Sequence, residues 1–422
     1  MKRDANQFRL RLSKLILALA IAAPALRVGA EGFRNPPYST FGLGRAGGRV
    51  AQVDDASAVQ NNPANLVTLT NAEFEYTPSI VSIAFHFQSS TVAQSANTKE
   101  PWKVLPNLYY ATPIQDGKLI FGLGITVPYG LAVKWDNKSS AFSQTTPGIW
   151  TFAAANGAPF YTRLTTVNVN PTLAWKMSDN VSIGLGLDVM GSDLEFRQYV
   201  APGGWWAKAY GIGIGAGANG AITWQMTDRQ RIAVSIRSPM DVKYHGHLRQ
   251  TGSPSGNISS SFDSEIKYPA ILDLGYGWQV TPTVRVESDL ELIEFSRFQT
   301  LPVRVGNNPY IPSQNIPEHW RDTYTVGVAG DWQVAPHWML RGGYQFYETP
   351  VPEMTFSPTI PDANQNVITV GVAYEHGRHT FEAAYGYDFY DTRHIQSNQN
   401  PNFIGTYTFN LHLFSLAYHY KF

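Results

Sequence analysis

Apolar residues alternate with polar or very small residues in a series of segments that begins at Ala72 and runs to the end of the chain. In residues 181–192 the apolar positions are Val181, Ile183, Leu185, Leu187 and Val189. The same division recurs in residues 118–130, 284–292 and 324–332. Alternation with a period of two predicts strands that have one face in an apolar surrounding and the other in a polar one, as between lipid and a lumen.

Fourteen segments of this kind can be counted along the chain. They are residues 72–88, 104–114, 117–130, 162–177, 180–199, 207–226, 230–249, 262–280, 283–298, 318–334, 336–348, 365–376, 378–393 and 404–422. Fourteen is an even number, as antiparallel barrels of bacterial outer membranes require. Short turn sequences alternate with longer connections, such as residues 131–161, 250–261 and 299–317. The sequence therefore predicts an all-β fold, a 14-stranded antiparallel transmembrane β-barrel over residues 72–422.

The last segment ends on an aromatic residue. Its apolar face carries Phe414, Leu416, Tyr418, Tyr420 and Phe422, and its other face carries Ser415, Ala417, His419 and Lys421. Such an end looks like the signal that the outer-membrane barrel assembly machinery reads, so we expect that machinery and outer-membrane lipid to be partners. A buried last strand of a soluble protein is the alternative, but Trp and Tyr are concentrated at segment ends, as in interfacial girdles.

The first 30 residues have the parts of an export signal. Lys2, Arg3, Arg9, Arg11 and Lys14 are basic, residues 15–23 are apolar, and residues 28–30 are Val, Gly and Ala. The apolar run is well below the ~20 residues that a membrane-spanning helix needs. The pattern predicts a cleaved signal peptide over residues 1–30 and residence in the outer membrane of a Gram-negative bacterium.

Residues 31–71 resemble neither the signal nor the strands. They contain Gly at positions 42, 44, 47 and 48, the pair Asp54-Asp55 and the turn-forming run Asn61-Asn62-Pro63-Ala64. No apolar period of 2 or 3.6 residues is sustained, so the segment has little core of its own. We expect it to be a plug, or hatch, inside the lumen of the barrel.

Composition excludes several classes of function. The chain has 32 basic and 32 acidic residues, so its charge gives no reason to expect nucleic acid as a partner. It has no Cys, which excludes thiolate metal sites and thiol catalysis. His245 and His247 could supply two metal ligands from one strand face, but no third ligand is evident nearby in the sequence. We therefore expect no metal, no other cofactor and no enzyme activity.

Two further patterns have structural explanations. Residues 215–220 match GxGxxG, but they lie in the longer run 211–218, in which Gly takes every second place, and no strand-to-helix transition follows. Glycine on the lumen face would leave room for the plug or for a bulky solute. The carboxylates of Glu287, Asp289 and Glu291 are explained by a hydrated interior as readily as by acid–base catalysis.

An ordered set of short motifs resembles the FadL-type family of outer-membrane transporters for long-chain fatty acids and other hydrophobic compounds. The motifs are Gly32-Phe33, Phe41-Gly42-Leu43-Gly44-Arg45-Ala46, Asp54-Asp55-Ala56, Asn62-Pro63-Ala64, Leu105-Pro106-Asn107 and Tyr420-Lys421-Phe422. The resemblance covers nearly all of the chain after the signal peptide. It implies a 14-stranded barrel with an N-terminal hatch, in agreement with the strand count.

The resemblance also implies functional residues. Asn62, Pro63 and Ala64 match the hatch motif of the family, and Pro128, Tyr129 and Gly130 lie where a kink in the third strand would open a lateral gap. Arg197 and Arg321 are candidates for a basic residue near the carboxylate of a solute. The aromatic candidates for solute capture at the outer loops are Trp150, Phe152, Phe160, Trp205 and Trp206.

Together these observations predict a passive outer-membrane transporter for hydrophobic compounds, either long-chain fatty acids or aromatic hydrocarbons. The solute would be captured at outer loops, enter an apolar lumen pocket and leave sideways near the kink. A non-selective aqueous porin is the alternative, because it would share the barrel but would have no plug at its N-terminus.

Overall fold

The computed structural model describes residues 32–35, 37–115, 117–137, 141–142, 159–201, 205–253 and 255–422. The predicted signal peptide lies outside the described residues, and so do the candidates Trp150 and Phe152. None of the helices in this part of the chain is long and apolar enough to cross a membrane.

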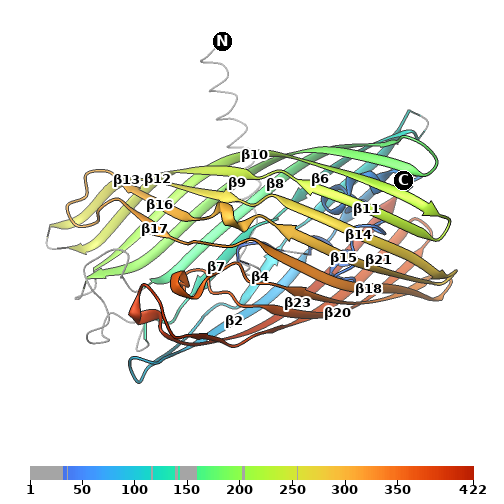
Figure 1. Cartoon of the computed structure of the whole chain (residues 1–422). Helices are drawn as coiled ribbons and strands as arrows, with labels where there is room; N and C mark the ends of the chain where they lie inside the picture. The colour runs from blue at the N-terminus through green and yellow to red at the C-terminus, as the bar shows by residue number, and fades with distance from the viewer. Residues whose placement is uncertain are drawn as a thin grey trace, which may run out of the picture.

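Strands form almost all of the described structure (Figure 1). In chain order they are β1 (Glu73–Tyr76), β2 (Ser79–Ser89), β3 (Ser95–Asn97), β4 (Trp102–Leu105), β5 (Leu108–Ile114), β6 (Leu119–Thr126), β7 (Gly130–Lys134), β8 (Pro159–Lys176), β9 (Val181–Ala201), β10 (Trp205–Thr227), β11 (Gln230–Arg237), β12 (Met240–Ser253), β13 (Gly256–Tyr268), β14 (Ile271–Thr281), β15 (Val284–Ile293), β16 (Thr300–Val305), β17 (Gln314–Pro317), β18 (Thr323–Ala335), β19 (Trp338–Tyr347), β20 (Gln365–His376), β21 (His379–Tyr390), β22 (Arg393–Ile395) and β23 (Gly405–Lys421). The short helices are α2 (Thr40–Gly44), α3 (Ala58–Asn61), η1 (Pro63–Thr68), η3 (Phe295–Arg297), η4 (Glu353–Thr355) and η5 (Pro401–Phe403).

These segments join into a closed 14-stranded antiparallel barrel. Several of its strands consist of two or more consecutive segments, for example β1 with β2 and β6 with β7. The barrel closes where the first strand pairs with the last, with Phe74 opposite Tyr420 and Ile80 opposite Phe414. The predicted fold class is confirmed, and each predicted segment overlaps one of the fourteen strands.

The alternation in the sequence corresponds to the two faces of the wall. Leu185, Leu187 and Val328 point outward and are 66%, 60% and 57% exposed, whereas Asp188 and Thr325, at the other parity of the same strands, are buried. An apolar outer face and a polar inner face are what a strand between lipid and a lumen requires, because the side chains of neighbouring residues point to opposite sides.

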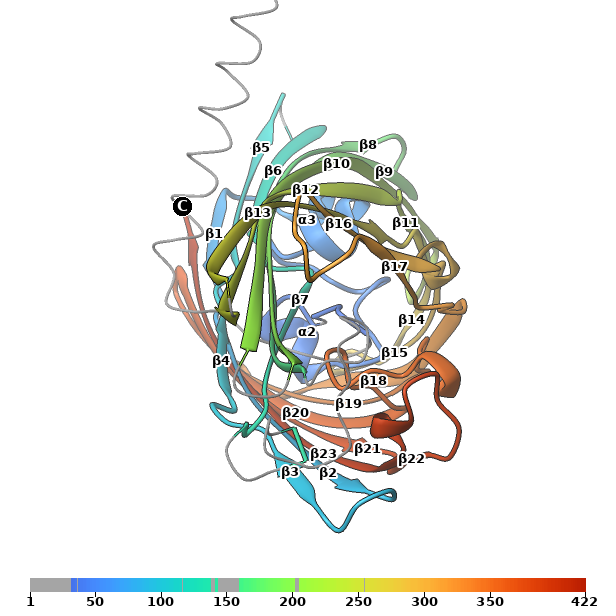
Figure 2. The same cartoon turned by 90° about the vertical axis from the view of Figure 1, so that its left-hand side faces the viewer.

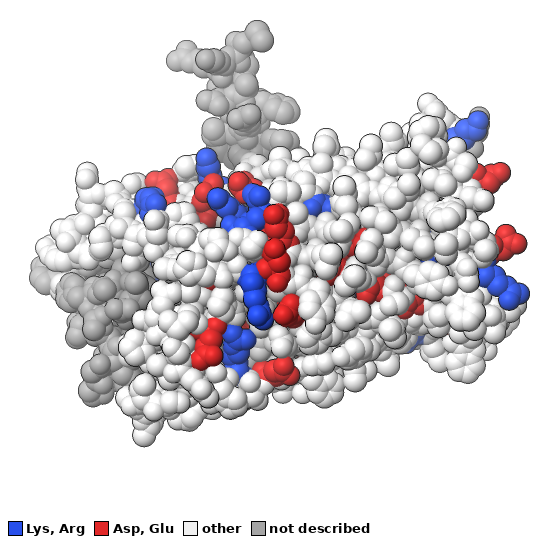
Figure 3. Space-filling model, in the orientation of Figure 1, with Lys and Arg blue, Asp and Glu red and all other residues white. Residues whose placement is uncertain are grey.

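Charged side chains mark one border of the apolar outer face. Figure 3 shows them gathered in a belt across the barrel, with few others between this belt and the end that carries the short turns. Asp241 and Lys243 on β12 and Lys267 on β13 are exposed there, and Arg297 in η3 pairs with Asp241 at 2.9 Å. We call the end with the short turns the turn end and the opposite one the loop end.

Two of the predicted long loops are strands instead. β12 and β13 stay paired as far as Ser253 opposite Gly256, and β16 pairs with β17 from Thr300 opposite Pro317. These parts lie on the loop side of the charged belt, where neither face touches lipid. Polar residues are therefore tolerated on both faces of β12 and β13 past residue 250, where the alternation is missing. In β16, Leu301 and Val303 do alternate with Pro302 and Arg304, a short pattern that the predicted segments did not include.

The segment before the wall lies inside the barrel. Figure 2 looks along the barrel and shows α2 and α3 within the ring of strands. Both helices are fully buried, although they have only five and four residues. Phe41, Val59 and Leu66 of this segment pack with Tyr109 and Ile120 of the wall. The segment thus takes its core from the barrel, because it has too few apolar residues to form one alone.

Lumen-facing glycines allow the segment to touch the wall. A Cβ on Gly184 of β9 would lie 2.4 Å from the backbone N of Ala64, and a Cβ on Gly343 of β19 would lie 2.4 Å from the carbonyl O of Ala46. Both distances are far below van der Waals contact, so only glycine permits these approaches.

The glycine run in β10 has a different role from the predicted one. A Cβ on Gly213 or Gly215 would meet Lys243, Met240 and Val242 of β12, not the plug. The chain bends between β11 and β12, and this bend presses against the inner face of β10. The prediction that these glycines make room for the plug is therefore wrong for this run.

Candidate functional site

A cavity of about 230 Å³ lies inside the loop end of the barrel. The ends of β9, β10, β12, β13 and β16 form its wall, and η4, η5 and their loops cover it. Most of its lining is apolar, including Leu248, Phe262, Leu301, Val303, Phe356 and Phe403. One basic and one acidic side chain also line it, Arg197 and Glu318. A mainly apolar cavity with few polar groups is typical of a site for a hydrophobic small molecule.

Arg197 already has partners in the structure. Its guanidinium lies 4.6 Å from the centre of the Tyr161 ring and 2.6 Å from a carboxylate oxygen of Glu195. Glu195 also accepts from Lys208 at 3.2 Å. Arg197 therefore already has a buried carboxylate as its partner, which it shares with Lys208.

Arg321, the second basic candidate, does not line this cavity. Its side chain is 59% exposed and lies 3.4 Å from Glu348. The predicted strand segment began at residue 318, but β18 begins at Thr323, so Arg321 precedes the strand. Alternation does not continue outside a strand, and the structure does not support a role for Arg321 in the cavity.

Glu318 was not predicted from the sequence, because a single acidic residue among polar neighbours does not indicate a binding site. In the structure it is buried at the edge of the apolar cavity. Burial away from water raises the pKa of its carboxyl to about 8. Glu318 is therefore largely protonated and neutral at pH 7.

The aromatic candidates near the loop end form small clusters outside the lining of the cavity. The ring of Phe160 lies 4.9 Å from Tyr199 and 6.3 Å from Trp206. Trp205 lies 5.5 Å from Tyr310. The structure therefore brings Phe160 and Trp206 together, while Trp205 belongs to the neighbouring cluster.

An aromatic cluster surrounds Phe33 and includes Trp320, which is close to Glu318 in the chain. Phe33 stacks on Trp320 at 5.0 Å, and its ring meets four other rings edge to face or nearly so. These are Tyr129, Tyr268, Phe295 and Phe298, with ring centres 5.4 to 6.0 Å away. Phe33 belongs to the N-terminal segment, whereas the other five residues belong to the strands of the barrel or to the connections between strand segments. Aromatic packing of this kind ties the start of the segment to the barrel.

The third strand of the wall is interrupted at the predicted kink. β6 ends at Thr126 and β7 begins at Gly130, so Pro128 and Tyr129 lie in the interruption. Across this step the third strand advances by four residues while the facing strand β8 advances by three. A one-residue excess is the signature of a β-bulge, which bends a strand.

Beyond the interruption, the second and third strands separate. Among the described residues, the ladder of β7 joins it to β8 alone. On its free edge the N-terminal segment takes the place of a strand: Gly130 N donates to the Phe33 carbonyl at 2.8 Å, and Asn35 N donates to the Pro128 carbonyl at 3.0 Å. Pairing with the second strand resumes at Lys134. The start of the segment therefore faces an opening in the hydrogen-bonded wall.

Acidic residues of β15 hold the N-terminal segment. Arg34 forms two hydrogen bonds with Glu291, of 2.9 and 2.8 Å. Glu287 pairs with Arg45 at 3.0 Å and accepts the backbone N–H groups of Val50, Ala51 and Gln52 at 2.8, 2.5 and 3.1 Å. The carboxylates predicted to face a hydrated interior are therefore buried and serve as anchors for the segment.

The Asn62-Pro63-Ala64 motif stabilises the same segment from within. The side chain of Asn62 accepts from Ala64 N at 3.0 Å and donates to the Val50 carbonyl at 2.7 Å and to Thr223 of β10 at 2.9 Å. Pro63 occupies the first position of η1, where its missing N–H costs nothing. The motif joins the turn at Val50, the helix η1 and the wall.

The comparisons with known proteins agree with this arrangement. The family model described as "Outer membrane protein transport protein (OMPP1/FadL/TodX)" matches residues 21–422. The chain is 24% identical over 408 residues to the long-chain fatty acid transport protein of Escherichia coli O6:H1, covering 86% of this chain and 87% of that one. It is 23% identical over 423 residues to outer membrane protein P1 of Haemophilus influenzae, covering 86% of this chain and 87% of that one.

Solved structures show the same fold. A FadL homologue of Pseudomonas aeruginosa is similar with a TM-score of 0.78 and 20% identity, covering 93% of this chain and 100% of that one. The toluene transporter TbuX of Ralstonia pickettii is similar with a TM-score of 0.69 and 18% identity, covering 90% of this chain and 100% of that one. The chain therefore belongs to the FadL-type family of outer membrane transport proteins, which reside in the outer membrane of Gram-negative bacteria and transport hydrophobic compounds.

Proposed function

We propose that this protein takes up neutral hydrophobic compounds by passive diffusion and releases them sideways through its wall. The observation that carries this proposal is the mainly apolar cavity of about 230 Å³ at the loop end. An apolar solute gains free energy by leaving water for such a lining. No energy source is required, since the solute moves down its own gradient.

The preference for a neutral solute is based on Arg197 and Glu318, the basic and the acidic side chain that line the cavity. Arg197 is already paired with Glu195 at 2.6 Å. A solute carboxylate would have to compete for Arg197 and would lie in the same small cavity as Glu318. At a pH above about 8, where Glu318 is ionised, two carboxylates would share this apolar site at a large cost. A hydrocarbon or an alcohol meets neither obstacle.

Release through the wall is supported by the opening beside β7. The backbone of Phe33 and Asn35 covers the free edge of that strand, and the side chain of Phe33 stacks on Trp320. One displacement of the start of the segment would therefore uncover the free edge and separate these two rings. A solute leaving there would pass directly into the hydrocarbon of the membrane.

An open aqueous porin is the less favoured function. The N-terminal segment fills the lumen of the described structure, and its helices α2 and α3 are fully buried. In a porin, deletion of residues 32–64 would leave selectivity unchanged, whereas in the proposed transporter it would let small hydrophilic solutes leak through the lumen.

Filling the cavity is expected to lower uptake. Leu248→Trp adds bulk at a buried lining position, and it should reduce the initial rate of toluene uptake severalfold in a host that lacks its own transporter. Leu187→Trp is the matched control, since Leu187 is 60% exposed on the outer face. Equal rates in the two variants, at equal amounts of folded barrel, would contradict a role of this cavity in uptake.

Affinity for a neutral solute is expected to depend on pH through Glu318. A bound solute keeps the cavity dry and so favours the protonated form, whose pKa is about 8. Binding is therefore at full strength below that pH and is lost as the pH rises through it, becoming roughly tenfold weaker at pH 9. The measurement is equilibrium binding of oleyl alcohol to the purified protein in detergent.

Two comparisons test this assignment. The Glu318→Gln variant should bind oleyl alcohol equally at pH 7 and pH 9, because its side chain does not titrate. It should also bind oleate, which differs from oleyl alcohol only in its head group, better than the wild type does at pH 9. An unchanged pH profile in Glu318→Gln would show that another group is responsible.

A further inference from the structure

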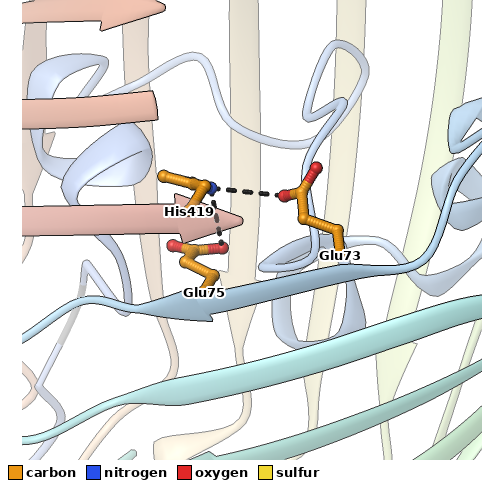
Figure 4. A group of neighbouring side chains, drawn as sticks. All are labelled: Glu73, Glu75 and His419. Atoms are coloured by element: carbon orange, nitrogen blue, oxygen red, sulfur yellow. Dashed lines mark hydrogen bonds and ion pairs between the residues drawn. The ribbon is translucent and has the colours of Figure 1, made fainter. Parts of the chain in front are cut away.

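A second cluster of ionisable side chains lies near the turn end, far from the cavity along the barrel. Glu73 and Glu75 are on β1 and His419 is on β23, and all three point into the barrel (Figure 4). They are 3%, 0% and 3% exposed. Because β1 pairs with β23 at the closure of the barrel, residues from the two ends of the wall meet here.

The ligand atoms of the three side chains are spaced as a metal ion needs. His419 Nδ1 lies 3.2 Å from Glu73 Oε1 and 3.9 Å from Glu75 Oε2. One ligand atom from each residue can be chosen so that all lie within 4.8 Å of one another. Ligands about 2.0–2.1 Å from a tetrahedral Zn²⁺ ion are roughly 3.3 Å apart, so small movements would bring these atoms to bonding distance.

Glu75 provides an independent indication of a ligand. Its side chain is fully buried, and neither of its carboxylate oxygens accepts a hydrogen bond from any described residue. A buried carboxylate without hydrogen bonds is strongly unfavourable unless a positive charge lies against it. The imidazole of His419, a common metal ligand, lies 3.9 Å from it.

The surroundings resemble the outer shell of a metal site. The other ring nitrogen of His419, Nε2, faces Glu382 of β21 at 3.7 Å, and Glu382 is held by Arg341 of β19 at 2.8 Å. A carboxylate behind the second nitrogen is the usual way to orient a metal-binding histidine. Glu73 also accepts the backbone N–H of Ala56 at 3.1 Å, so the cluster touches the N-terminal segment.

An access route reaches the cluster from the turn end. A cavity of about 170 Å³ is lined by Glu73, His419 and Glu382, and it extends to the turn residues Pro336 and His337. A hydrated ion could enter from this end without passing the Phe33 cluster. The site therefore does not depend on the solute pathway.

We propose that Glu73, Glu75 and His419 bind one divalent transition-metal ion, Zn²⁺, and that the bound ion helps to fasten the N-terminal segment at Ala56 to the wall. Two carboxylates and one imidazole suit Zn²⁺, whereas Mg²⁺ and Ca²⁺ prefer oxygen ligands alone. Sequence spacing did not indicate this site, because His419 lies 346 positions after Glu73.

The test is metal binding to the full-length protein purified in detergent and stripped with a chelator. Equilibrium dialysis against Zn²⁺ should give one bound ion per chain, and excess Mg²⁺ or Ca²⁺ should not displace it. Glu75→Gln and His419→Asn should each weaken Zn²⁺ binding at least about tenfold, as expected for the loss of one ligand. The matched control is His245→Asn, which removes an exposed histidine that pairs with Asp263 at 2.6 Å.

A second measurement does not depend on variants that fold. X-ray absorption at the zinc edge of the wild-type protein should show a first shell of nitrogen and oxygen with an imidazole contribution. Absence of stoichiometric Zn²⁺ in the wild type would overturn the proposal. Equal losses of binding in His245→Asn and His419→Asn would overturn it too, since binding would then be at surface histidines.

Discussion

A disulfide between Arg34→Cys and Tyr129→Cys is expected to stop uptake of hydrophobic compounds, and its reduction is expected to restore it. Arg34 and Tyr129 are opposite each other where the N-terminal segment pairs with the interrupted third strand. Their neighbours carry the hydrogen bonds, so the two residues form a non-hydrogen-bonded antiparallel pair. The Cα atoms of such pairs are about 4.5 Å apart, which is within the range that a disulfide spans.

The physical reason for this result is that the cross-link fixes the start of the segment over the free edge of β7. If the solute leaves through the wall there, a segment that cannot move keeps the path closed. The natural chain has no Cys, so only the intended bond can form within it. Uptake of labelled oleyl alcohol and toluene would be measured in cells before and after treatment with a reducing agent.

Comparing the oxidised and reduced forms of one protein removes the effect of the lost side chains. Arg34→Cys also breaks the hydrogen bonds with Glu291, but it does so in both forms. The two single-cysteine variants should transport equally with and without the reducing agent. Equal uptake by the oxidised and reduced double variant would rule out lateral release at β7.

Glu287→Ala is expected to loosen the N-terminal segment more than any other single change in the anchors described above. Glu287 is the partner of Arg45 and of three consecutive backbone N–H groups, at Val50, Ala51 and Gln52. Both charged side chains are 0% exposed. Removal of one member of a buried ion pair costs about 3–5 kcal/mol, because the remaining charge stays buried.

Hydrogen exchange measures this change directly. The amides of residues 50–52 should exchange roughly a hundredfold faster or more in Glu287→Ala, since about 1.4 kcal/mol corresponds to a factor of ten. The strand amides of the barrel should keep their wild-type rates. In planar bilayers the variant should also conduct ions more often than the wild type, because the lumen is blocked by the segment.

The control is Glu348→Ala, which removes the partner of Arg321 at the surface. That pair is 3.4 Å apart and its two side chains are 59% and 24% exposed, so little stabilisation is expected from it. Exchange at residues 50–52 should then be the same as in the wild type. Unchanged exchange in Glu287→Ala would show that the segment is held by packing alone.

The lipid-facing part of the wall was predictable residue by residue, because a strand between lipid and a lumen must alternate. Leu185 and Leu187 are exposed where the pattern placed them outward, and Asp188 is buried. The pattern failed at the loop end, where β12, β13, β16 and β17 extend past the membrane. Neither face of those strands touches hydrocarbon. The alternation of apolar and polar residues that marks the lipid-facing strands is therefore not required there.

Site residues were predictable to the extent that they depend on local backbone chemistry. Pro128 and Gly130 interrupt a strand because proline lacks an N–H and glycine weakens pairing, and the structure has its interruption between Thr126 and Gly130. Arg197 lines the cavity, but Arg321 does not, since the alternation of β18 cannot be extended to residues that precede the strand. Glu318 could be identified only from its buried surroundings.

The sequence by itself determined the class of the protein, the number of wall strands and the face on which each lipid-facing residue lies. These follow from the period of the chain and from the medium on each side of the wall, which act on residues close together in sequence. Only the tertiary structure decided which distant residues meet: Phe33 with Trp320, Glu287 with Arg45, and Glu73 with His419. Closure of the barrel and insertion of the N-terminal segment create those contacts. Neither event produces a repeating pattern of residues that could be recognised in the sequence.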